Sequence, residues 1–207
     1  MGESPIVYVV DDDISVRESL EMRFVSLGLR CEIFDKADAF LSRERDACPA
    51  CLVLDCRLPD LDGFEVHRRA ASESLPVVFI TAFGDIPAAV RAMKAGAIEY
   101  LTKPFSEDSL LGAIRQGLAR SRAALDRDDD KRALLACYDT LSRRERQVMA
   151  LVSSGLSNKV AGGRLGVCEQ TVKAHRGRVM RKMKASSLAD LVRKAAVMRQ
   201  SSTWQEP

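Results

Sequence analysis

Short apolar runs alternate with amphipathic stretches through the first 120 residues of the chain. Parallel strands need a crossover connection, so this alternation predicts helices on both faces of one sheet. We therefore expect an α/β domain built on a doubly wound, five-stranded parallel sheet. The expected strands are Ile6–Val10, Cys31–Phe34, Cys51–Asp55, Val77–Thr81 and Tyr100–Thr102, and the expected helices are Ser15–Leu27, Ala37–Arg45, Phe64–Ser72, Pro87–Ala95 and Glu107–Ala119.

The charge is distributed unevenly, which indicates a second domain of different character. Residues 1–120 carry 14 Lys and Arg against 20 Asp and Glu, a net charge of −6, whereas residues 121–207 carry 18 against 9, a net charge of +9. Between Thr140 and Gln200 there are 14 basic and 3 acidic residues. This excess favours a polyanionic partner such as DNA, and the alternative is an ordinary solvated surface of basic helices.

The basic part is expected to be a small all-α domain of four helices. Ser142 and Glu145 have the spacing of a capping box at the start of the first helix. The preceding segment, 121–139, is highly charged and lacks Pro and Gly, and we interpret it as a partly helical linker. The expected organisation is thus 1–120, 121–139, 140–200 and a tail at 201–207, with helices at Arg143–Ser153, Asn158–Leu165, Glu169–Lys184 and Ser187–Met198.

Two further classes of protein are disfavoured. No apolar run approaches the roughly 20 residues of a membrane helix, and the N-terminus lacks the basic region of a secretory signal, so we expect a soluble, cytoplasmic chain without a membrane partner. Cys48 and Cys51 have the C-x-x-C form of redox and zinc sites. The only histidines, His67 and His175, lie far away on separate expected helices, so we interpret the thiols as structural.

The carboxyl ends of four expected strands carry acids, a hydroxyl and an ammonium. Ligands of doubly wound sheets bind beyond this edge, so we expect these groups to converge. Neighbouring carboxylates repel one another, and a divalent cation would relieve that repulsion. Because Mg²⁺ takes about six oxygen ligands and keeps several waters, few protein ligands suffice. We expect Mg²⁺, or Mn²⁺, to be bound by Asp12 and Asp55, by Asp11 through a water, and by the backbone carbonyl of Arg57.

A carboxylate beside such a cation can attack phosphorus and become an aspartyl phosphate. Asp55 is the best candidate because it stands alone on the middle strand, whereas Asp11 and Asp12 are better employed as metal ligands. The Lys103 ammonium and the Thr81 hydroxyl would then each bind one phosphoryl oxygen.

In the basic domain, the second and third expected helices have the lengths of a helix-turn-helix. Val172 and Val179 belong to an apolar stripe of the third helix, and the opposite face is expected to enter the major groove of DNA. Lys173 can donate to guanine and Ala174 can contact a thymine methyl group. The expected groove set is Gln170, Lys173, Ala174, Gly177 and Arg181, and the expected phosphate contacts are Lys159, Thr171, Arg176, Arg178 and Lys182.

A family resemblance is carried by the stretches VVDDD, LVLDCRLPDLDG, VVFITAFGD and AMKAGAIEYLTKPF, followed by LSRRERQVM and TVKAHRGRVMRKM. With these stretches in this order, the chain resembles a two-component response regulator of the FixJ/NarL type. The resemblance implies a flavodoxin-like receiver domain followed by a LuxR-type helix-turn-helix domain. It also implies phosphorylation of Asp55 by a partner histidine kinase and binding of promoter DNA. Activation of transcription is the commoner outcome in this family. The implied metal ligands are Asp11, Asp12 and Asp55, and the implied switch residues are Thr81, Tyr100 and Lys103.

The switch has an expected physical form. When Thr81 moves to bond the phosphoryl group, it vacates space that the ring of Tyr100 can enter, and this reshapes the face around the fourth helix. The resemblance suggests a homodimer on phosphorylation, with contacts from Val90, Met93 and Lys94. The alternative is that Val90 and Met93 are only core residues.

Two features of the basic domain depart from the family pattern. Cys168 stands where Ser or Thr usually caps the recognition helix, which costs about 1 kcal/mol. Gly162 and Gly163 lie together in the preceding helix, at roughly 1 kcal/mol each relative to Ala. The DNA-binding domain is therefore expected to be only marginally stable by itself.

A phosphorylation-dependent transcriptional regulator explains both halves of the sequence. Its enzymatic activity would be limited to self-phosphorylation from small donors and self-dephosphorylation. One alternative is a small Mg-dependent phosphohydrolase, for which the sequence offers no substrate pocket and no acid or base for turnover. The other alternative is a phosphate-independent DNA-binding regulator, which would not need the full set of acids with Thr81 and Lys103.

Overall fold

The computed structural model describes residues 4–44, 47–72 and 74–199. The chain divides into two compact units, Met1–Asp126 and Arg127–Pro207, each of which has its own core. None of the helices in these ranges combines the length and the apolar character needed to cross a bilayer. The expected tail, 201–207, lies outside the described residues.

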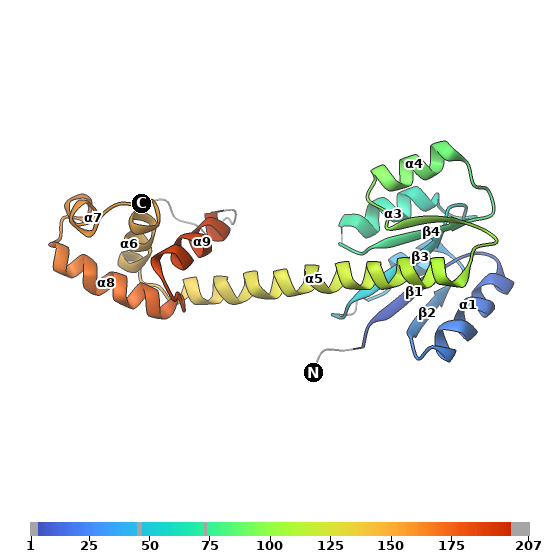
Figure 1. Cartoon of the computed structure of the whole chain (residues 1–207), viewed down its shortest axis with the longest axis horizontal. Helices are drawn as coiled ribbons and strands as arrows, with labels where there is room; N and C mark the ends of the chain where they lie inside the picture. Colours follow the sequence, from blue (N-terminus) through green and yellow to red (C-terminus); the bar gives the residue numbers. More distant parts are fainter. Residues whose placement is uncertain (1–3, 45–46, 73, 200–207) are drawn as a thin grey trace. The chain divides into compact units, whose positions relative to one another are not determined.

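The N-terminal unit contains the expected parallel sheet, and its strand order is β2-β1-β3-β4-β5 (Figure 1). This order is that of a flavodoxin-like fold, in which the strands are parallel and the direction in which successive strands are added to the sheet reverses between β1 and β3. The middle strands are buried on both faces, which is why they read as continuous apolar runs. The strands are β1 (Ile6–Val10), β2 (Arg30–Phe34), β3 (Ala50–Asp55), β4 (Val77–Thr81) and β5 (Glu99–Thr102).

Helices cover the sheet on both faces, as expected for a doubly wound fold (Figure 1). Phe24 of α1 and Ile114 of α5 are buried against one face, and Val66 of α3 and Ala92 of α4 against the other. The helices are α1 (Ile14–Ser26), α2 (Ala37–Leu41), α3 (Gly63–Ser72), α4 (Ile86–Lys94) and α5 (Glu107–Asp139).

The second helix is shorter than the sequence predicts. It ends at Leu41 instead of continuing to position 45, and position 45 itself lies outside the described residues. The side chain of Arg43 turns back at this end, where its guanidinium donates to the Phe40 carbonyl at 2.9 Å and stacks on the Phe40 ring. A carbonyl at the end of the helix is thereby satisfied by a side chain.

The expected linker is helical throughout, which corrects the prediction of a partly helical segment. Residues 121–139 belong to α5, a single helix of 33 residues. The early part of α5 packs on the sheet, where the Ala50 N–H donates to the buried Ser121 hydroxyl at 3.0 Å. Near its other end, Tyr138 is buried in the core of the C-terminal unit. Without Gly or Pro between Ser121 and Asp139, no residue there interrupts the helix.

The C-terminal unit has the four expected helices. The capping box is confirmed, because the Ser142 hydroxyl accepts from the Glu145 N–H and the Glu145 carboxylate accepts from the Ser142 N–H. The third helix is slightly shorter than expected, since Met183 is its C-cap and Lys184 adopts a left-handed φ of 48°. The helices are α6 (Arg143–Ser153), α7 (Asn158–Leu165), α8 (Glu169–Lys182) and α9 (Leu188–Arg199).

The two neighbouring glycines of α7 have different roles. A Cβ on Gly162 would lie 2.7 Å from the Val167 carbonyl oxygen, whereas a Cβ on Gly163 would meet nothing within 4 Å. Gly162 is thus required by the close approach of α7 to the turn before α8. Only at Gly163 could a residue of higher helix propensity, such as Ala, be introduced without a steric clash.

We therefore expect opposite effects from two matched substitutions. Gly163→Ala should raise the free energy of unfolding of the C-terminal unit by up to about 1 kcal/mol. Gly162→Ala should lower it by about 1–3 kcal/mol, because the backbone must shift to admit the methyl group. Hydrogen exchange of peptides from α7 and α8 measures both changes. If both substitutions changed the free energy of unfolding in the same direction, the two glycines would not have different roles.

Glu145 makes the C-terminal unit sensitive to acid. Burial by itself would raise the pKa of Glu145, but the Lys182 ammonium at 2.7 Å and the Ser142 N–H at 2.9 Å outweigh burial and lower it. A carboxylate with a lowered pKa stabilises the fold above its ordinary pKa of 4.5, and this contribution is lost as pH falls through the folded value.

Glu145→Gln should therefore destabilise the unit by about 1–2 kcal/mol at neutral pH. The difference from wild type should shrink as pH falls below the ordinary carboxylate range. Chemical denaturation of both proteins across this pH range tests the prediction. A difference that stays constant with pH would show that the charge of Glu145 is not responsible.

Candidate functional site

Three carboxylates meet at the carboxyl edge of the sheet, where the sequence predicts a site. Asp11 follows β1 and is fully buried, Asp12 is exposed, and Asp55 ends β3 with 7% of its surface exposed. Each offers an oxygen within 4.8 Å of the others. A set of hard oxygen donors this closely spaced fits Mg²⁺ or Mn²⁺.

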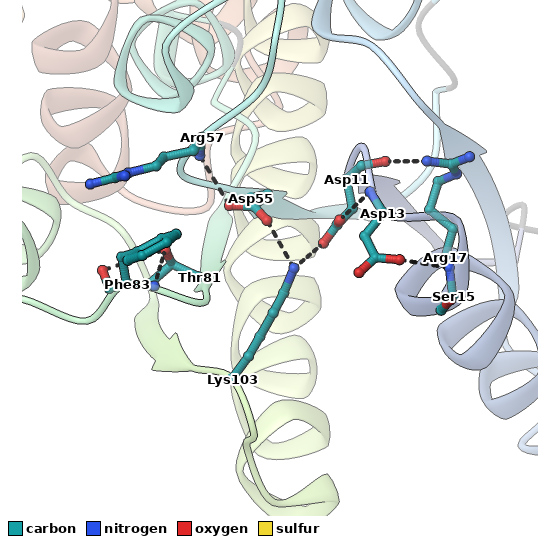
Figure 2. Close-up of polar contacts among 9 residues, drawn as sticks. All are labelled: Asp11, Asp13, Ser15, Arg17, Asp55, Arg57, Thr81, Phe83 and Lys103. Atoms are coloured by element: carbon teal, nitrogen blue, oxygen red, sulfur yellow. Dashed lines mark hydrogen bonds and ion pairs between the residues drawn. The ribbon is translucent and has the colours of Figure 1, made fainter.

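Lys103 provides a cation inside this cluster (Figure 2). Its ammonium donates to Asp11 Oδ2 at 2.6 Å and to Asp55 Oδ2 at 2.8 Å. Burial alone would lower the pKa of Lys103, but the hydrogen bonds to the two carboxylates outweigh burial and raise it. Lys103 is therefore charged at neutral pH, and it offsets the repulsion between the two buried acids.

The third consecutive acid, Asp13, has a separate function as the N-cap of α1. Its carboxylate accepts from the Ser15 N–H at 2.8 Å. Its own N–H donates to Asp11 Oδ1 at 2.9 Å, and Arg17 donates to the Asp11 carbonyl at 2.7 Å (Figure 2). The start of α1 thus fixes the orientation of Asp11 from two sides.

Thr81 and Tyr100 lie on the same side of the site, on adjacent strands. Thr81 is buried, and its hydroxyl accepts from the Phe83 N–H at 3.2 Å. Tyr100 is half-buried, its ring centroid lies 6.2 Å from that of Phe79, and its hydroxyl donates to the Phe83 carbonyl at 3.4 Å. The Tyr100 ring therefore already occupies an inward position beside β4.

Arg57 has two contacts near Asp55. Its backbone N–H donates to Asp55 Oδ1 at 3.0 Å, and its guanidinium lies over the Phe83 ring at 4.3 Å (Figure 2). The sequence reasoning used only the carbonyl of Arg57 and missed this stacking. A cation–π contact between two loops leaves no pattern in the sequence.

The exposed surface of α4 is more apolar than predicted. Val90 and Met93 are 45% and 47% exposed, so the reading that they are only core residues is wrong. Lys94 is exposed beside them. Ile86, at 80% exposure, belongs to the same helix and was not predicted.

Helix α8 has the two expected faces. Val172, Val179 and Met183 are buried in the core of the C-terminal unit. The opposite face is exposed, and Cys168 caps the helix without a hydrogen bond from its side chain to the backbone, as expected. Within the described part of the chain, the exposed members of the predicted DNA-contact sets make no hydrogen bond or ion pair to other side chains: Lys159, Gln170, Lys173, Ala174, Gly177, Arg178 and Arg181.

The other three predicted DNA contacts are engaged inside the unit. Lys182 donates to the Thr140 carbonyl at 2.9 Å and pairs with Glu145, so it joins α8 to the start of α6. Arg176 donates to Asn158 at 3.5 Å, and the Thr171 hydroxyl lies 3.2 Å from the Cys168 sulfur.

Two family profiles account for most of the chain. Residues 7–115 match the response regulator receiver domain, and residues 139–195 match the bacterial regulatory proteins of the luxR family. The transcriptional regulatory protein FixJ of Bradyrhizobium diazoefficiens is 39% identical over 191 residues, which cover 91% of this chain and 93% of FixJ. The chain is a response regulator of the FixJ/NarL type.

Other relatives of this response regulator share both domains. The response regulator protein TmoT of Ectopseudomonas mendocina is 44% identical over 193 residues, covering 92% of this chain and 88% of TmoT. A solved structure of the response regulator StyR has a TM-score of 0.81 at 46% identity and covers 94% of this chain and 99% of StyR.

This response regulator is a phosphorylation-dependent transcriptional regulator, and its relatives do not favour the alternative of a phosphohydrolase. Its receiver domain implies a histidine kinase as partner, and its luxR-family domain implies binding to DNA. Receiver domains generally bind Mg²⁺ in an acidic pocket, which corresponds here to the cluster of Asp11, Asp12 and Asp55.

Proposed function

We propose that Asp55 accepts the phosphoryl group. The observation that carries this proposal is the convergence of Asp55 with Asp11, Asp12 and Lys103 at the end of the middle strand. A carboxylate oxygen of Asp55 forms the new bond to phosphorus while the bond from phosphorus to the kinase imidazole breaks. The leaving imidazole keeps the bonding electron pair and takes up a proton.

Asp11, Asp12 and Asp55 would hold Mg²⁺ or Mn²⁺, with the backbone carbonyl of Arg57 as a further ligand. A cation bound there would supply positive charge that offsets the charge of the phosphoryl oxygens. Asp11 is oriented by the Asp13 N–H, and Lys103, already 2.8 Å from Asp55 Oδ2, is positioned to bind a phosphoryl oxygen. The same arrangement supports self-phosphorylation from small donors and self-dephosphorylation by water.

Thr81 and Tyr100 would transmit the change. The Thr81 hydroxyl accepts from the Phe83 N–H at 3.2 Å and donates to the Phe83 carbonyl at 3.5 Å, and both contacts are long, so it can turn to a phosphoryl oxygen at small cost. Tyr100 is bound to the Phe83 carbonyl by a long contact of 3.4 Å. If the segment at Phe83 moved with Thr81, the position of the Tyr100 side chain would change, and with it the surface of α4.

The exposed apolar face of α4 would form the dimer contact of the phosphorylated protein. Ile86, Val90 and Met93 are large apolar side chains on one short helix, with Lys94 beside them. Exposed apolar side chains grouped in this way are typical of interaction surfaces.

Promoter DNA would bind the exposed face of α8. Lys173, Ala174 and Gly177 would face base edges with Gln170 and Arg181, while Lys159 and Arg178 would contact phosphates. Thr171 and Arg176 would add phosphate contacts beside their internal partners. We assign Lys182 to the stability of the unit, because its ammonium is already bound. The protein would act in the cytoplasm, where DNA and kinase are accessible.

Promoter-fragment binding before and after incubation with Mg²⁺ and a small phosphoryl donor tests this function. Phosphorylated protein should form dimers and bind a fragment with two half-sites more tightly than unmodified protein. Equal affinity in both states would instead support a phosphate-independent regulator.

A further inference from the structure

One side chain joins the C-terminal end of α8 to two other helices. The end of α8 lies beside the end of α5 (Figure 1). The Lys182 ammonium donates to the Thr140 carbonyl, directly after α5, at 2.9 Å, and to the Glu145 carboxylate of α6 at 2.7 Å. Glu145 is buried and Lys182 is half-buried, so water screens this ion pair less than a pair on the surface.

The two groups that accept from the ammonium are themselves fixed. The Leu141 N–H donates to the Tyr138 carbonyl at 2.9 Å, which closes the turn that contains Thr140, and the Tyr138 side chain is buried in the core of the unit. The Glu145 carboxylate also accepts from the Ser142 N–H at 2.9 Å. Both acceptors therefore hold the end of α8 at a defined place.

The two ends of α8 are attached differently. At the N-terminal end, Cys168 caps the helix without a hydrogen bond from its side chain. At the C-terminal end, the Met183 side chain is buried, and the Lys194 ammonium of α9 donates to the Met183 and Lys184 carbonyls at 3.1 and 2.7 Å. Short polar contacts with other helices thus hold α8 at the end that carries Lys182.

The internal contacts of Lys182 compete with a contact to DNA. An ammonium has three protons, and Lys182 donates two of them inside the unit. Turning toward a phosphate would draw the ammonium away from Glu145, and the buried carboxylate would then lack its cation. The geometry therefore favours an ion pair that stays intact when α8 meets DNA.

We propose that Lys182 and Glu145 are positioning residues for sequence-specific DNA binding. Their contact fixes the end of α8 and thereby sets the angle at which side chains such as Lys173 reach base edges. Without this contact α8 tilts, so that base contacts are lost, whereas phosphate contacts tolerate the displacement. This inference rests on the proposed binding of DNA by α8 and deepens it.

Three variants of the full-length protein test the proposal: Lys182→Gln, Glu145→Gln and the double variant. Each is treated with Mg²⁺ and a small phosphoryl donor and titrated at several salt concentrations. One DNA probe is a duplex that the wild-type protein has enriched from a random pool, and the other is an unrelated duplex of equal length. Thermal unfolding establishes a temperature at which every variant is folded.

Asp139→Asn is the matched control. Asp139 lies next to Thr140, its side chain is 66% exposed, and its distance to Arg146 is 3.8 Å. The control removes one negative charge from the same corner of the unit as Glu145→Gln does, but it leaves the contacts of Lys182 in place. We expect it to bind the enriched duplex at least as tightly as wild type.

All three test variants should bind the enriched duplex about tenfold more weakly than wild type, because the same contact is lost in each. Affinity for the unrelated duplex should stay within about twofold, and the salt dependence should be unchanged. The double variant should lose no more than the larger single loss. General electrostatics predicts the opposite sign for Glu145→Gln, since loss of an acid favours binding to a polyanion.

Three outcomes would overturn the inference and leave the proposed function intact. If Glu145→Gln binds as tightly as Asp139→Asn, the ion pair does not position α8. If Lys182→Gln weakens binding to both duplexes and lowers the salt slope by about one, Lys182 is a phosphate contact. If both duplexes lose affinity equally with an unchanged slope, the pair contributes only to stability. A wild-type protein that enriches no duplex removes the proposed function and this inference together.

Discussion

Asp55→Asn is expected to abolish the gain in dimerisation and in promoter affinity that follows treatment with Mg²⁺ and a phosphoryl donor. The amide is a far weaker nucleophile than the carboxylate and carries no charge for the cation or for Lys103. Because no other described carboxylate combines this place on the middle strand with contact to Lys103, no substitute acceptor is expected. Sedimentation and fragment binding measure both losses.

Asp13→Asn is the matched control. It removes one negative charge from the same edge of the sheet, yet Asn can still cap α1 as Asp13 does. We expect the control to retain the phosphorylation-dependent gain. Equal losses in both variants would show that the net charge of this edge matters, and not the nucleophile at position 55.

Lys173→Ala is expected to have the largest effect on DNA binding. Lys173 is exposed on α8, and its side chain makes no hydrogen bond or ion pair within the described part of the chain, so its ammonium is free for DNA. A lost base contact costs about 1–3 kcal/mol, and a dimer loses two, so affinity should fall about 30-fold or more. The preference for one base pair in each half-site should also relax.

Lys131→Ala provides the comparison for this experiment. Lys131 is an exposed cation of α5, and its removal changes the net charge of the C-terminal unit equally. Binding titrations at several salt concentrations should show near wild-type affinity for this control. If the two variants weaken binding to the same extent, general electrostatics and not a contact from α8 accounts for the loss.

The sheet and the converging side chains could be predicted because their signals are local. Buried strands such as β1 and β3 are apolar runs, and an acid directly follows β1 and ends β3. The parallel fold then brings those residues together. The capping box could be predicted for the same reason, because its two residues, Ser142 and Glu145, lie within one turn of helix.

Features that depend on contacts between distant residues could not be predicted in this way. Lys182 pairs with Glu145, which lies far from it in the sequence. From the sequence alone, a lysine among other basic residues of a helix is interpreted as a DNA contact. The continuous course of α5 was missed because a densely charged segment has no apolar periodicity. Asp13 could have been recognised as an N-cap from the helical pattern that follows it.

Phosphorylation of Asp55 can be checked by peptide mapping after incubation with Mg²⁺ and a small phosphoryl donor. We expect a single phosphoryl adduct, on the peptide that contains Asp55. This adduct should be absent when the metal is chelated and absent in Asp55→Asn. An adduct that persists in Asp55→Asn, or that maps to another part of the chain, would show that Asp55 is not the phosphoacceptor.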